Sequence, residues 1–166
     1  GKIRFREPQI EMSHGACGKA SRRLVEGLFA PLLFGSATGP LGDAAHIQIN
    51  GTRIAMTTDS FVVKPLSFPG GSIGELAING TVNDLAVSGA KAEAIVGTFV
   101  LEAGVPTNIL EAEVRAMGKA AQQAGVVIAG GDTKVVEHGK ADHMYVTTTG
   151  IGRLIPGVEI SSQSVK

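Results

Sequence analysis

The sequence predicts an α+β domain in which helices cover one face of a mixed or antiparallel sheet, and three observations predict this class. Asn50-Gly51 joins two apolar runs, which is the strongest short signal for a β-hairpin. Helical periods and strand-like runs follow one another without the regular order of a parallel α/β fold. The chain has 166 residues, of which 43% are hydrophobic, so it is long enough to bury the core of one domain.

The amino-terminal third predicts one helix and the hairpin. Apolar residues at helical spacing indicate a helix over residues 20–34, which is weakened near Pro31. A loop rich in Gly, Pro, Ser and Thr follows over residues 35–42. Strands are expected over residues 45–49 and 52–60, and four of their side chains are expected to share a buried face: Ile47, Ile49, Ile54 and Met56.

The middle of the chain predicts two helices separated by a strand. Ser72-Ile73-Gly74-Glu75 fits a capping box, so a helix is expected to start there and to run to about Ser88. An interior strand is expected over residues 94–101. Thr107 is expected to cap a second helix that Gly125 ends, and the buried stripe of this helix is expected to be Leu110, Val114, Met117, Ala121 and Ala124.

Three further segments complete the expected domain. A turn-rich loop is expected over residues 65–71, before the first of the two helices. A short buried strand is expected over residues 126–129, and Gly130-Gly131 is expected to end it. The final strand is expected over residues 144–150, after which the chain becomes polar from Pro156 onward.

Composition argues against several classes of protein. Lys and Arg total 15 and balance 15 Asp and Glu, whereas nucleic-acid binding needs a surplus of positive charge. No apolar run is long enough to span a membrane, and the first residues lack the apolar segment of a secretory signal. Cys17 is the single cysteine, so neither an internal disulfide nor a thiolate metal site is expected, and a reducing cytoplasm is the expected location.

Three familiar catalytic or nucleotide-binding signatures fail on inspection. The segment over residues 15–20 imitates a P-loop, but Ser13 stands where the first glycine is needed and Ala20 replaces the hydroxyl residue that holds Mg²⁺. The segment over residues 150–155 begins like a dinucleotide-binding fingerprint but lacks the third glycine. The chain contains no G-x-S-x-G nucleophile elbow.

Four aspartates stand beside glycine, at the ends of expected strands or inside an apolar helix: Asp43, Asp59, Asp84 and Asp132. Two carboxylates about 4 Å apart repel by roughly 4 kcal/mol, so the four can converge only around a divalent cation. An all-oxygen ligand set favours Mg²⁺ or Ca²⁺, and Mg²⁺ commonly brings substrate phosphates. The alternative is that each aspartate merely caps a turn. Asp84 and the neighbouring Asn83 differ, because polar groups inside an otherwise apolar helix need partners.

Two other groups offer weaker hypotheses. The small-residue loop His14-Gly15-Ala16-Cys17-Gly18-Lys19 precedes a helix and can present backbone N–H groups and a lysine charge to phosphate; the alternative is a flexible connector. Cys17 is interpreted as an incidental small residue rather than a nucleophile. Lys134, on an expected loop after Asp132, is either a solvated lysine or a partner for phosphate or a proton.

Three segments resemble the HypE family of hydrogenase maturation proteins, in the superfamily of aminoimidazole ribonucleotide synthetase, thiamine-monophosphate kinase and selenophosphate synthetase. They cover residues 57–74, 80–90 and 130–136, and the first contains Pro65-Leu66-Ser67-Phe68-Pro69-Gly70-Gly71, which separates this family from its relatives. The resemblance extends from about residue 14 to residue 152. One departure is Cys17, which takes a glycine place in the family's usual His-Gly-x-Gly-Gly loop; phosphate binding there is in doubt if the position needs a positive φ.

The resemblance implies the N-terminal lobe of a two-lobed fold that dimerises by joining its strands into a barrel. It implies an N-terminal arm over residues 1–13, an ATP- and Mg²⁺-binding dimerisation domain over residues 14–155, and a linker over residues 156–166 to a second lobe. Lys134 matches a family lysine and is the catalytic candidate. The other implied roles are ATP or phosphate binding by His14, Gly15, Gly18, Lys19, Asp59, Asn83, Asp132 and Thr133, and metal binding by Asp43, Asp59, Asp84 and Asp132.

The implied activity is an ATP-dependent dehydration. In the family, an S-carbamoyl group on a C-terminal cysteine becomes a thiocyanate, the source of the cyanide ligand of [NiFe]-hydrogenase. The implied partners are a second copy of the chain, the carbamoyltransferase maturation factor HypF and the HypC–HypD scaffold complex. Two alternatives stay open, namely a dimerisation and docking module that is inactive alone and a related ATP-dependent small-molecule phosphotransferase.

Overall fold

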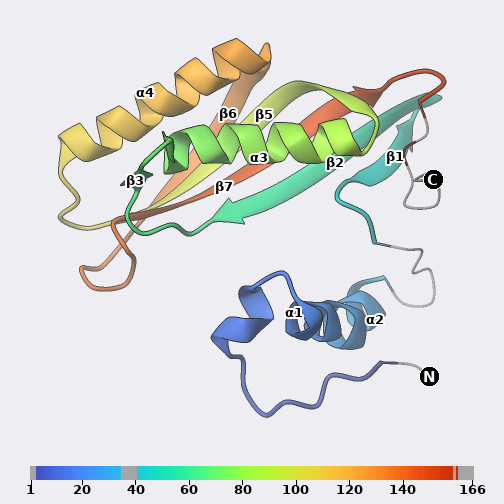
Figure 1. Cartoon of the computed structure of the whole chain (residues 1–166), viewed down its shortest axis with the longest axis horizontal. Coiled ribbons are helices and arrows are strands. Elements are labelled where there is room, and N and C mark those ends of the chain that lie inside the picture. Colours follow the sequence, from blue (N-terminus) through green and yellow to red (C-terminus); the bar gives the residue numbers. More distant parts are fainter. Residues whose placement is uncertain (1–2, 35–40, 159, 161–166) are drawn as a thin grey trace. The chain divides into compact units, whose positions relative to one another are not determined.

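The computed structural model describes residues 3–34, 41–158 and 160, and the chain forms two compact units (Figure 1). The first unit ends at Leu41 and the second begins at Gly42. The domain expected over residues 14–155 therefore includes parts of both units. Most of the loop expected over residues 35–42 and most of the linker expected over residues 156–166 lie outside the described residues.

The first unit is helical. A short 3-10 helix, η1 (Met12–Gly15), precedes one continuous helical segment that consists of α1 (Lys19–Leu24), the π-helical turn η2 (Val25–Phe29) and α2 (Ala30–Leu33). The helix predicted over residues 20–34 is thus confirmed. Its wide π turn ends at Phe29, two residues before Pro31, which lacks an N–H and whose ring crowds the carbonyl four residues earlier, at Gly27.

The second unit contains a five-stranded mixed sheet with the order β1-β2-β7-β5-β6. All neighbouring strands are antiparallel except β5 and β6. Asn50 and Gly51 have φ of 48° and 82°, as a two-residue type I′ turn requires, so the predicted hairpin is confirmed. The strands are β1 (Ala45–Ile49), β2 (Thr52–Phe61), β5 (Ala90–Glu102), β6 (Val127–Val136) and β7 (Met144–Leu154).

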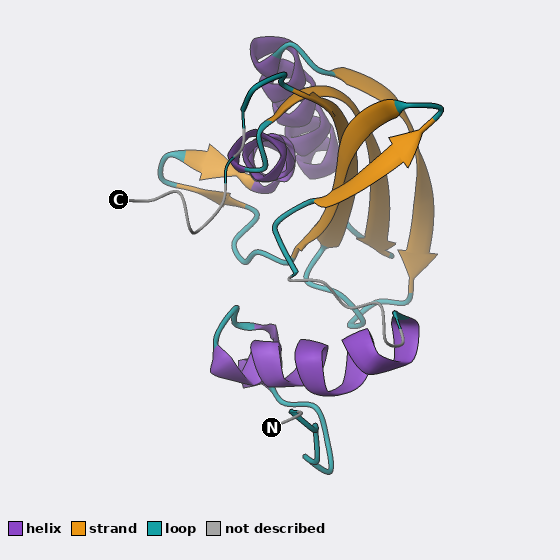
Figure 2. Ribbon diagram, turned by 90° about the vertical axis from the view of Figure 1, so that its right-hand side faces the viewer, coloured by secondary structure: helices purple, strands orange, loops and turns teal. Residues whose placement is uncertain are grey.

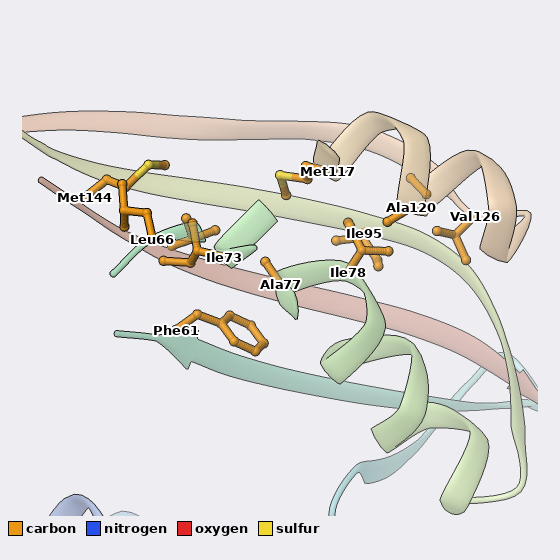
Figure 3. Packing of buried hydrophobic residues seen from close by; sticks show 12 residues of the cluster. Phe61, Leu66, Ile73, Ala77, Ile78, Ile95, Met117, Ala120, Val126 and Met144 are labelled. Carbon is orange, nitrogen blue, oxygen red and sulfur yellow. The ribbon is translucent and has the colours of Figure 1, made fainter. Parts of the chain in front are cut away.

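Two long helices, α3 (Ile73–Val87) and α4 (Thr107–Ala124), pack on the same face of this sheet (Figure 2). The expected loop over residues 65–71 contains a small hairpin of β3 (Ser67–Phe68) and β4 (Gly71–Ser72). The core lies between helices and sheet, and Figure 3 shows part of it. Its largest fully buried apolar side chains are Ile73, Ile78, Leu85, Ile95, Met144 and Val146. The α+β class is confirmed.

The start of α3 is stabilised in a different way from the one predicted. The Ser72 side chain forms no cap, and its Oγ is the one enclosed side-chain polar atom without a partner in the described part of the chain. Instead, the Ile73 N–H donates to the Leu66 carbonyl at 2.8 Å. The Gly74 N–H donates to Glu113 Oε2, on α4, at 3.0 Å. The helix prediction is right and the capping-box mechanism is wrong.

The buried side of α4 is rotated from the predicted stripe. Pro106, not Thr107, is its N-cap, and Gly125 ends the helix in the left-handed conformation as predicted. Met117 and Ala121 are buried, but Val114 is 46% exposed. Glu113 takes a buried place instead, because its carboxylate accepts the Gly74 N–H of α3.

Two strand predictions need correction. β6 is ten residues long and largely exposed, and it continues through Gly130-Gly131 rather than ending there. The face expected to be buried is largely exposed: Ile47, Ile49 and Met56 are 38%, 53% and 42% exposed, and Ile54 is half-buried. The register explains this, since Ala55 and Thr57 of β2 point toward the helices and their neighbours point away. Among the described residues, no helix is long and apolar enough to cross a lipid bilayer.

Candidate functional site

Three of the four predicted aspartates converge where β2 meets α3. Thr57 on β2 connects two of them: its Oγ1 lies 2.8 Å from the backbone oxygen of Asp43 and 3.4 Å from Oδ2 of Asp84 on α3. Asp59 follows Thr57 by two residues on β2, so both side chains leave the strand on the helix-covered face. The structure therefore brings Asp43, Asp59 and Asp84 into one acidic cluster.

The pKa of Asp84 is raised within this acidic cluster. Partial burial is the largest cause, followed by the negative charges of Asp59 and Asp43, and the hydrogen bond with Thr57 acts in the opposite direction. The Thr57 hydroxyl has a single hydrogen, and the shorter contact gives it to the Asp43 carbonyl. The contact of the hydroxyl with Asp84 Oδ2, at the longer distance of 3.4 Å, is therefore the weaker of the two, and burial and like charge prevail in raising the pKa of Asp84.

A buried pair of threonines holds α3 beside the acidic cluster. Thr148 on β7 lies opposite Asp59 in the strand register, and its hydroxyl donates to the Ala77 carbonyl of α3 at 2.9 Å. Thr81 on α3 reaches the same hydroxyl oxygen at 2.6 Å. The sequence prediction did not include Thr57, Thr81 or Thr148. The signal was present in the threonine-rich strand segments Thr57-Thr58 and Thr147-Thr148-Thr149.

The donor set of the acidic cluster fits Mg²⁺. In the described part of the chain, no three His, Cys, Asp or Glu side chains are arranged closely enough to hold a metal ion by themselves. Mg²⁺ does not require such a cage, because it commonly binds through one or two carboxylates and keeps water or phosphate oxygens. The like charges that raise the pKa of Asp84 are the charges that a bound cation offsets.

Asp132 lies away from this acidic cluster. The strand register places Asp59 of β2 beside Thr148 of β7, which lies beside Gly97 of β5, which in turn lies beside Gly131 of β6. Strands β7 and β5 therefore separate β2 from β6 by about 14 Å. Asp132 follows Gly131, and its side chain therefore points to the opposite face from Asp59. The structure does not bring the fourth aspartate to the other three within one chain.

Asp132 instead pairs with the predicted catalytic lysine. Lys134 Nζ lies 2.7 Å from Asp132 Oδ2, and both side chains are exposed. The hydrogen bond from Lys134 is the main reason that the pKa of Asp132 is lowered. Both residues lie in β6 and not on a loop as expected. Alternate residues of a strand share a face, which is why the pair forms.

The glycine pair before Asp132 borders a cavity of about 500 Å³ beneath α4, which Met117 and Thr133 also line. A Cβ on Gly131 would lie 2.0 Å from the Gly97 carbonyl oxygen, so only glycine allows β5 and β6 to approach here. The volume is that of a small-ligand pocket. Of the predicted phosphate-binding residues, Asp132 and Thr133 line this cavity, whereas Asn83 is exposed on α3.

The predicted phosphate loop belongs to the first unit. His14 is buried, its Nδ1 accepts the Glu11 N–H at 2.9 Å, and its ring packs edge-on against Phe5. Gly15, Gly18 and Lys19 are exposed, and Lys19 begins α1. Cys17 has a φ of 52°, so this position does require the left-handed backbone that glycine adopts freely.

The chain is similar to a known family of domains and to several curated proteins. The family model of the AIR synthase related protein, N-terminal domain, matches residues 41–154, which contain all four aspartates. Carbamoyl dehydratase HypE of Azotobacter vinelandii is 42% identical over 165 residues, which cover 99% of this chain and 48% of that protein. The chain spans about half the length of the curated relatives it matches.

Two solved structures show the same arrangement of elements. The crystal structure of a HypE–HypF complex matches with a TM-score of 0.78 at 45% identity, covering 86% of this chain and 46% of that chain. The crystal structure of HypE in complex with ATP matches with a TM-score of 0.62 at 46% identity, covering 89% of this chain and 44% of that chain. The sequence similarity to the HypE of Azotobacter vinelandii covers 99% of the chain and so includes the segment that contains His14 and Lys19.

Proposed function

The chain belongs to the AIR synthase related family, as its N-terminal domain, and we propose that it is the N-terminal half of an ATP-dependent carbamoyl dehydratase. The observation that carries the proposal is the similarity to carbamoyl dehydratases over nearly the whole chain. The acidic cluster of Asp43, Asp59 and Asp84 supports it, because a reaction that uses ATP needs a place for a cation beside phosphate.

The proposed reaction removes water from a carbamoyl group carried on a C-terminal cysteine of the full-length protein. ATP transfers its γ-phosphoryl group to the carbamoyl oxygen, and ADP is released. The nitrogen then loses its two protons, the carbon–oxygen bond breaks, and phosphate departs to leave a thiocyanate. Phosphorylation is needed because an amide oxygen is a poor leaving group and a phosphate is a good one. The thiocyanate is the proposed source of the cyanide ligand of [NiFe]-hydrogenase.

Each predicted residue takes a role within this proposal. Asp43, Asp59 and Asp84 would hold Mg²⁺, which offsets the negative charge of the triphosphate when bound. Asp59, Asn83, Asp132 and Thr133 contribute to nucleotide binding, and Lys134 positions the substrate or transfers a proton. His14, Gly15, Gly18 and Lys19 form the phosphate loop. In this loop, His14 supports the backbone through its contact with Glu11, while the exposed Lys19 supplies the charge.

Calorimetric titration of the 166-residue chain with ATP tests the nucleotide site. We expect heat of binding with Mg²⁺ present, little without it, and a loss of at least tenfold in affinity for Asp84→Asn. The matched control is Glu111→Gln, which removes an exposed carboxylate that pairs only with Arg115 in the described structure. Equal affinity in Asp84→Asn and wild type would remove the acidic cluster from the proposal.

The full-length protein tests the activity. Its ADP production should depend on a carbamoylated C-terminal cysteine, and Asp84→Asn or Asp132→Asn should abolish it. A rate of ADP release that does not depend on carbamoylation, but rises when a small phosphate acceptor is added, would instead indicate a phosphotransferase. Carbamoyl-dependent turnover that survives both substitutions would show that other groups carry the chemistry.

A dimerisation module is the second candidate, and the uncovered face of the sheet favours it. This open face carries exposed apolar side chains from four strands: Ile47, Ile49, Met56, Val96 and Ile151. Contiguous exposed apolar surface of this kind marks an interaction site. We propose that a second copy covers it and that the two sheets join into a barrel.

The remaining proposed partners follow from the resemblance to HypE, and for one of them a solved complex adds support. A HypE structure in complex with HypF supports a carbamoyltransferase of that kind as the partner that loads the cysteine. A HypC–HypD scaffold is proposed to receive the product. The proposed location is the cytoplasm, where the exposed free thiol of Cys17 would stay reduced. Co-purification of the full-length protein with each tagged partner tests these assignments.

A further inference from the structure

A second cavity of about 500 Å³ lies on the other side of α4 from the glycine pair, away from the acidic cluster. Its walls come from the segment before β3, from the first turns of α4 and from the loop that precedes β7. Figure 1 shows these three segments at one end of the sheet. Leu66 and Ile109 give it apolar walls, and Glu113 is the buried acid that lines it. The proposed function uses none of these side chains.

Glu113 has an unused oxygen that faces this cavity. The residue is only 5% exposed, and its Oε2 accepts the Gly74 N–H. Among the described residues, no donor lies within hydrogen-bond distance of Oε1. The one fully enclosed side-chain polar atom without a partner in this part of the chain is Ser72 Oγ, so Oε1 is not fully enclosed. Oε1 is therefore open to solvent, and the surface that Glu113 lines is this cavity.

The charge of Glu113 is not balanced by a neighbouring cation. None of the ion pairs among the described residues includes it. The one lysine at the rim, Lys64, is engaged by Asp142 at 2.5 Å. The cavity therefore combines apolar walls with one nearly buried carboxylate that has no paired cation and an unused lone-pair direction. A cationic hydrogen-bond donor satisfies both requirements.

We propose that this cavity binds a primary ammonium group on an apolar stem, the chemistry of a lysine side chain or an alkylamine. The ammonium group donates to Glu113 Oε1 while the stem packs against Leu66 and Ile109. The rim pair of Lys64 and Asp142 leaves the mouth of the cavity close to neutral, so the selectivity comes from the buried acid. The volume accommodates a ligand of this size.

The test compares n-pentylamine with n-pentanol by NMR titration of the 166-residue chain, with the Gly74 amide as the reporter. This amide donates to the other oxygen of Glu113, so it senses a new bond on the carboxylate directly. We expect pentylamine to bind about tenfold more tightly than pentanol, the ratio for a hydrogen bond to a charged group. Equal affinities would overturn the proposal, and this comparison needs no variant.

Three variants sharpen the result. Glu113→Gln keeps an acceptor for the Gly74 N–H and removes the charge, so it should lose the preference for pentylamine. Lys64→Gln frees the Asp142 carboxylate at the rim and should tighten pentylamine binding. Glu111→Gln removes a nearby α4 acid that does not line the cavity and should change nothing. Unchanged pentylamine affinity in folded Glu113→Gln would contradict the assignment.

A peptide arm separates the two sources of the ammonium group. The peptide acetyl-Ala-Ala-Lys-Ala-Ala-amide is compared with pentylamine and with the same peptide carrying norleucine in place of lysine. Tighter binding of the lysine peptide than of pentylamine identifies a polypeptide side chain as the natural occupant. Tighter binding of pentylamine identifies a free amine. Equal binding of the lysine and norleucine peptides, without a pentylamine preference, would refute both.

Discussion

At the scale of single residues, Asp84 is held in an environment that opposes its charge. Burial, Asp59 and Asp43 all raise its pKa above the ordinary value of 3.8. A carboxyl whose pKa is raised on folding stabilises the folded state at pH values below its unfolded pKa. That contribution is lost as the pH rises through the higher folded pKa. The free domain therefore loses stability as the pH rises from the unfolded pKa of Asp84 through its higher folded pKa, because Asp84 ionises.

Asp84→Asn should remove this pH dependence. In urea unfolding without divalent cations, we expect the variant to be more stable than wild type at pH 7, by up to about 1 kcal/mol, because the repulsion among partly exposed charges is modest. The difference should shrink near pH 4. With Mg²⁺ and ATP added, the order should reverse, since only the wild type binds the cation. A variant that is less stable at pH 7 without Mg²⁺ would show that Asp84 is an ordinary structural acid.

Cys17 offers a second test at this scale. A non-glycine residue in the left-handed region costs about 1–2 kcal/mol, whereas glycine costs roughly 0.5–1 kcal/mol in unfolded-chain entropy. Cys17→Gly should therefore stabilise the start of α1 by about 0.5–1 kcal/mol. Hydrogen exchange of the α1 amides measures the effect locally, and those amides should exchange more slowly. Cys17→Ala, which keeps the strain and removes the thiol, is the control and should leave exchange near that of wild type.

At the scale of elements, the packing of α3 against α4 depends on Gly74. A Cβ at this position would lie 2.1 Å from the Glu113 carbonyl oxygen, which is backbone and cannot move without displacing α4. The same glycine donates its N–H to the Glu113 side chain. The contact therefore fixes both the separation of the two helices and the start of α3.

Gly74→Ala should destabilise the second unit by about 1–3 kcal/mol or more, as overpacking does in a filled core. Gly118→Ala is the matched control, because Gly118 is also helical and has open space where its Cβ would lie. That substitution should instead stabilise by up to about 1 kcal/mol through helix propensity. Urea denaturation of both variants measures the two effects. A mild loss in Gly74→Ala would mean that α4 shifts easily on its neighbour.

The helices and the hairpin could be predicted from the sequence, but the way these elements pack together could not. Helix periodicity and the Asn50-Gly51 turn are local signals, and both led to correct elements. The buried face of the hairpin was assigned wrongly, because alternation identifies two faces but not the one that helices cover. The role of Glu113 in capping α3 was missed, because 39 residues separate it from Gly74 and no local pattern links them. The convergence of Asp43, Asp59 and Asp84 was expected, whereas the strand register that places Asp132 elsewhere was not visible.

At the scale of the whole molecule, the open face of the sheet is the surface for which we propose a partner. Met56, Val96 and Ile151 belong to three different strands and are 42%, 44% and 40% exposed. The proposed second copy would remove this apolar surface from water. The pair of Asp132 and Lys134 lies on the same open face, so the proposed dimer would also enclose it.

Ile151→Lys should therefore break self-association. Light scattering of the wild-type chain should give twice the mass of the monomer, and the variant should give the monomer mass. Val87→Lys serves as the control, because Val87 is similarly exposed but lies on α3, on the other side of the sheet. Wild-type chain that is monomeric at high concentration would remove the dimer from the proposal.

The bond from Gly74 to Glu113 has a consequence for the order in which the protein can mature on the ribosome. When translation has released the chain only as far as Gly104, all of α3 has been synthesised but the carboxylate that receives its leading amide has not. The bond from the Gly74 N–H to Glu113 can form only after 39 further residues beyond Gly74 have emerged. The start of α3 therefore gains this bond only after the first turns of α4 have been synthesised.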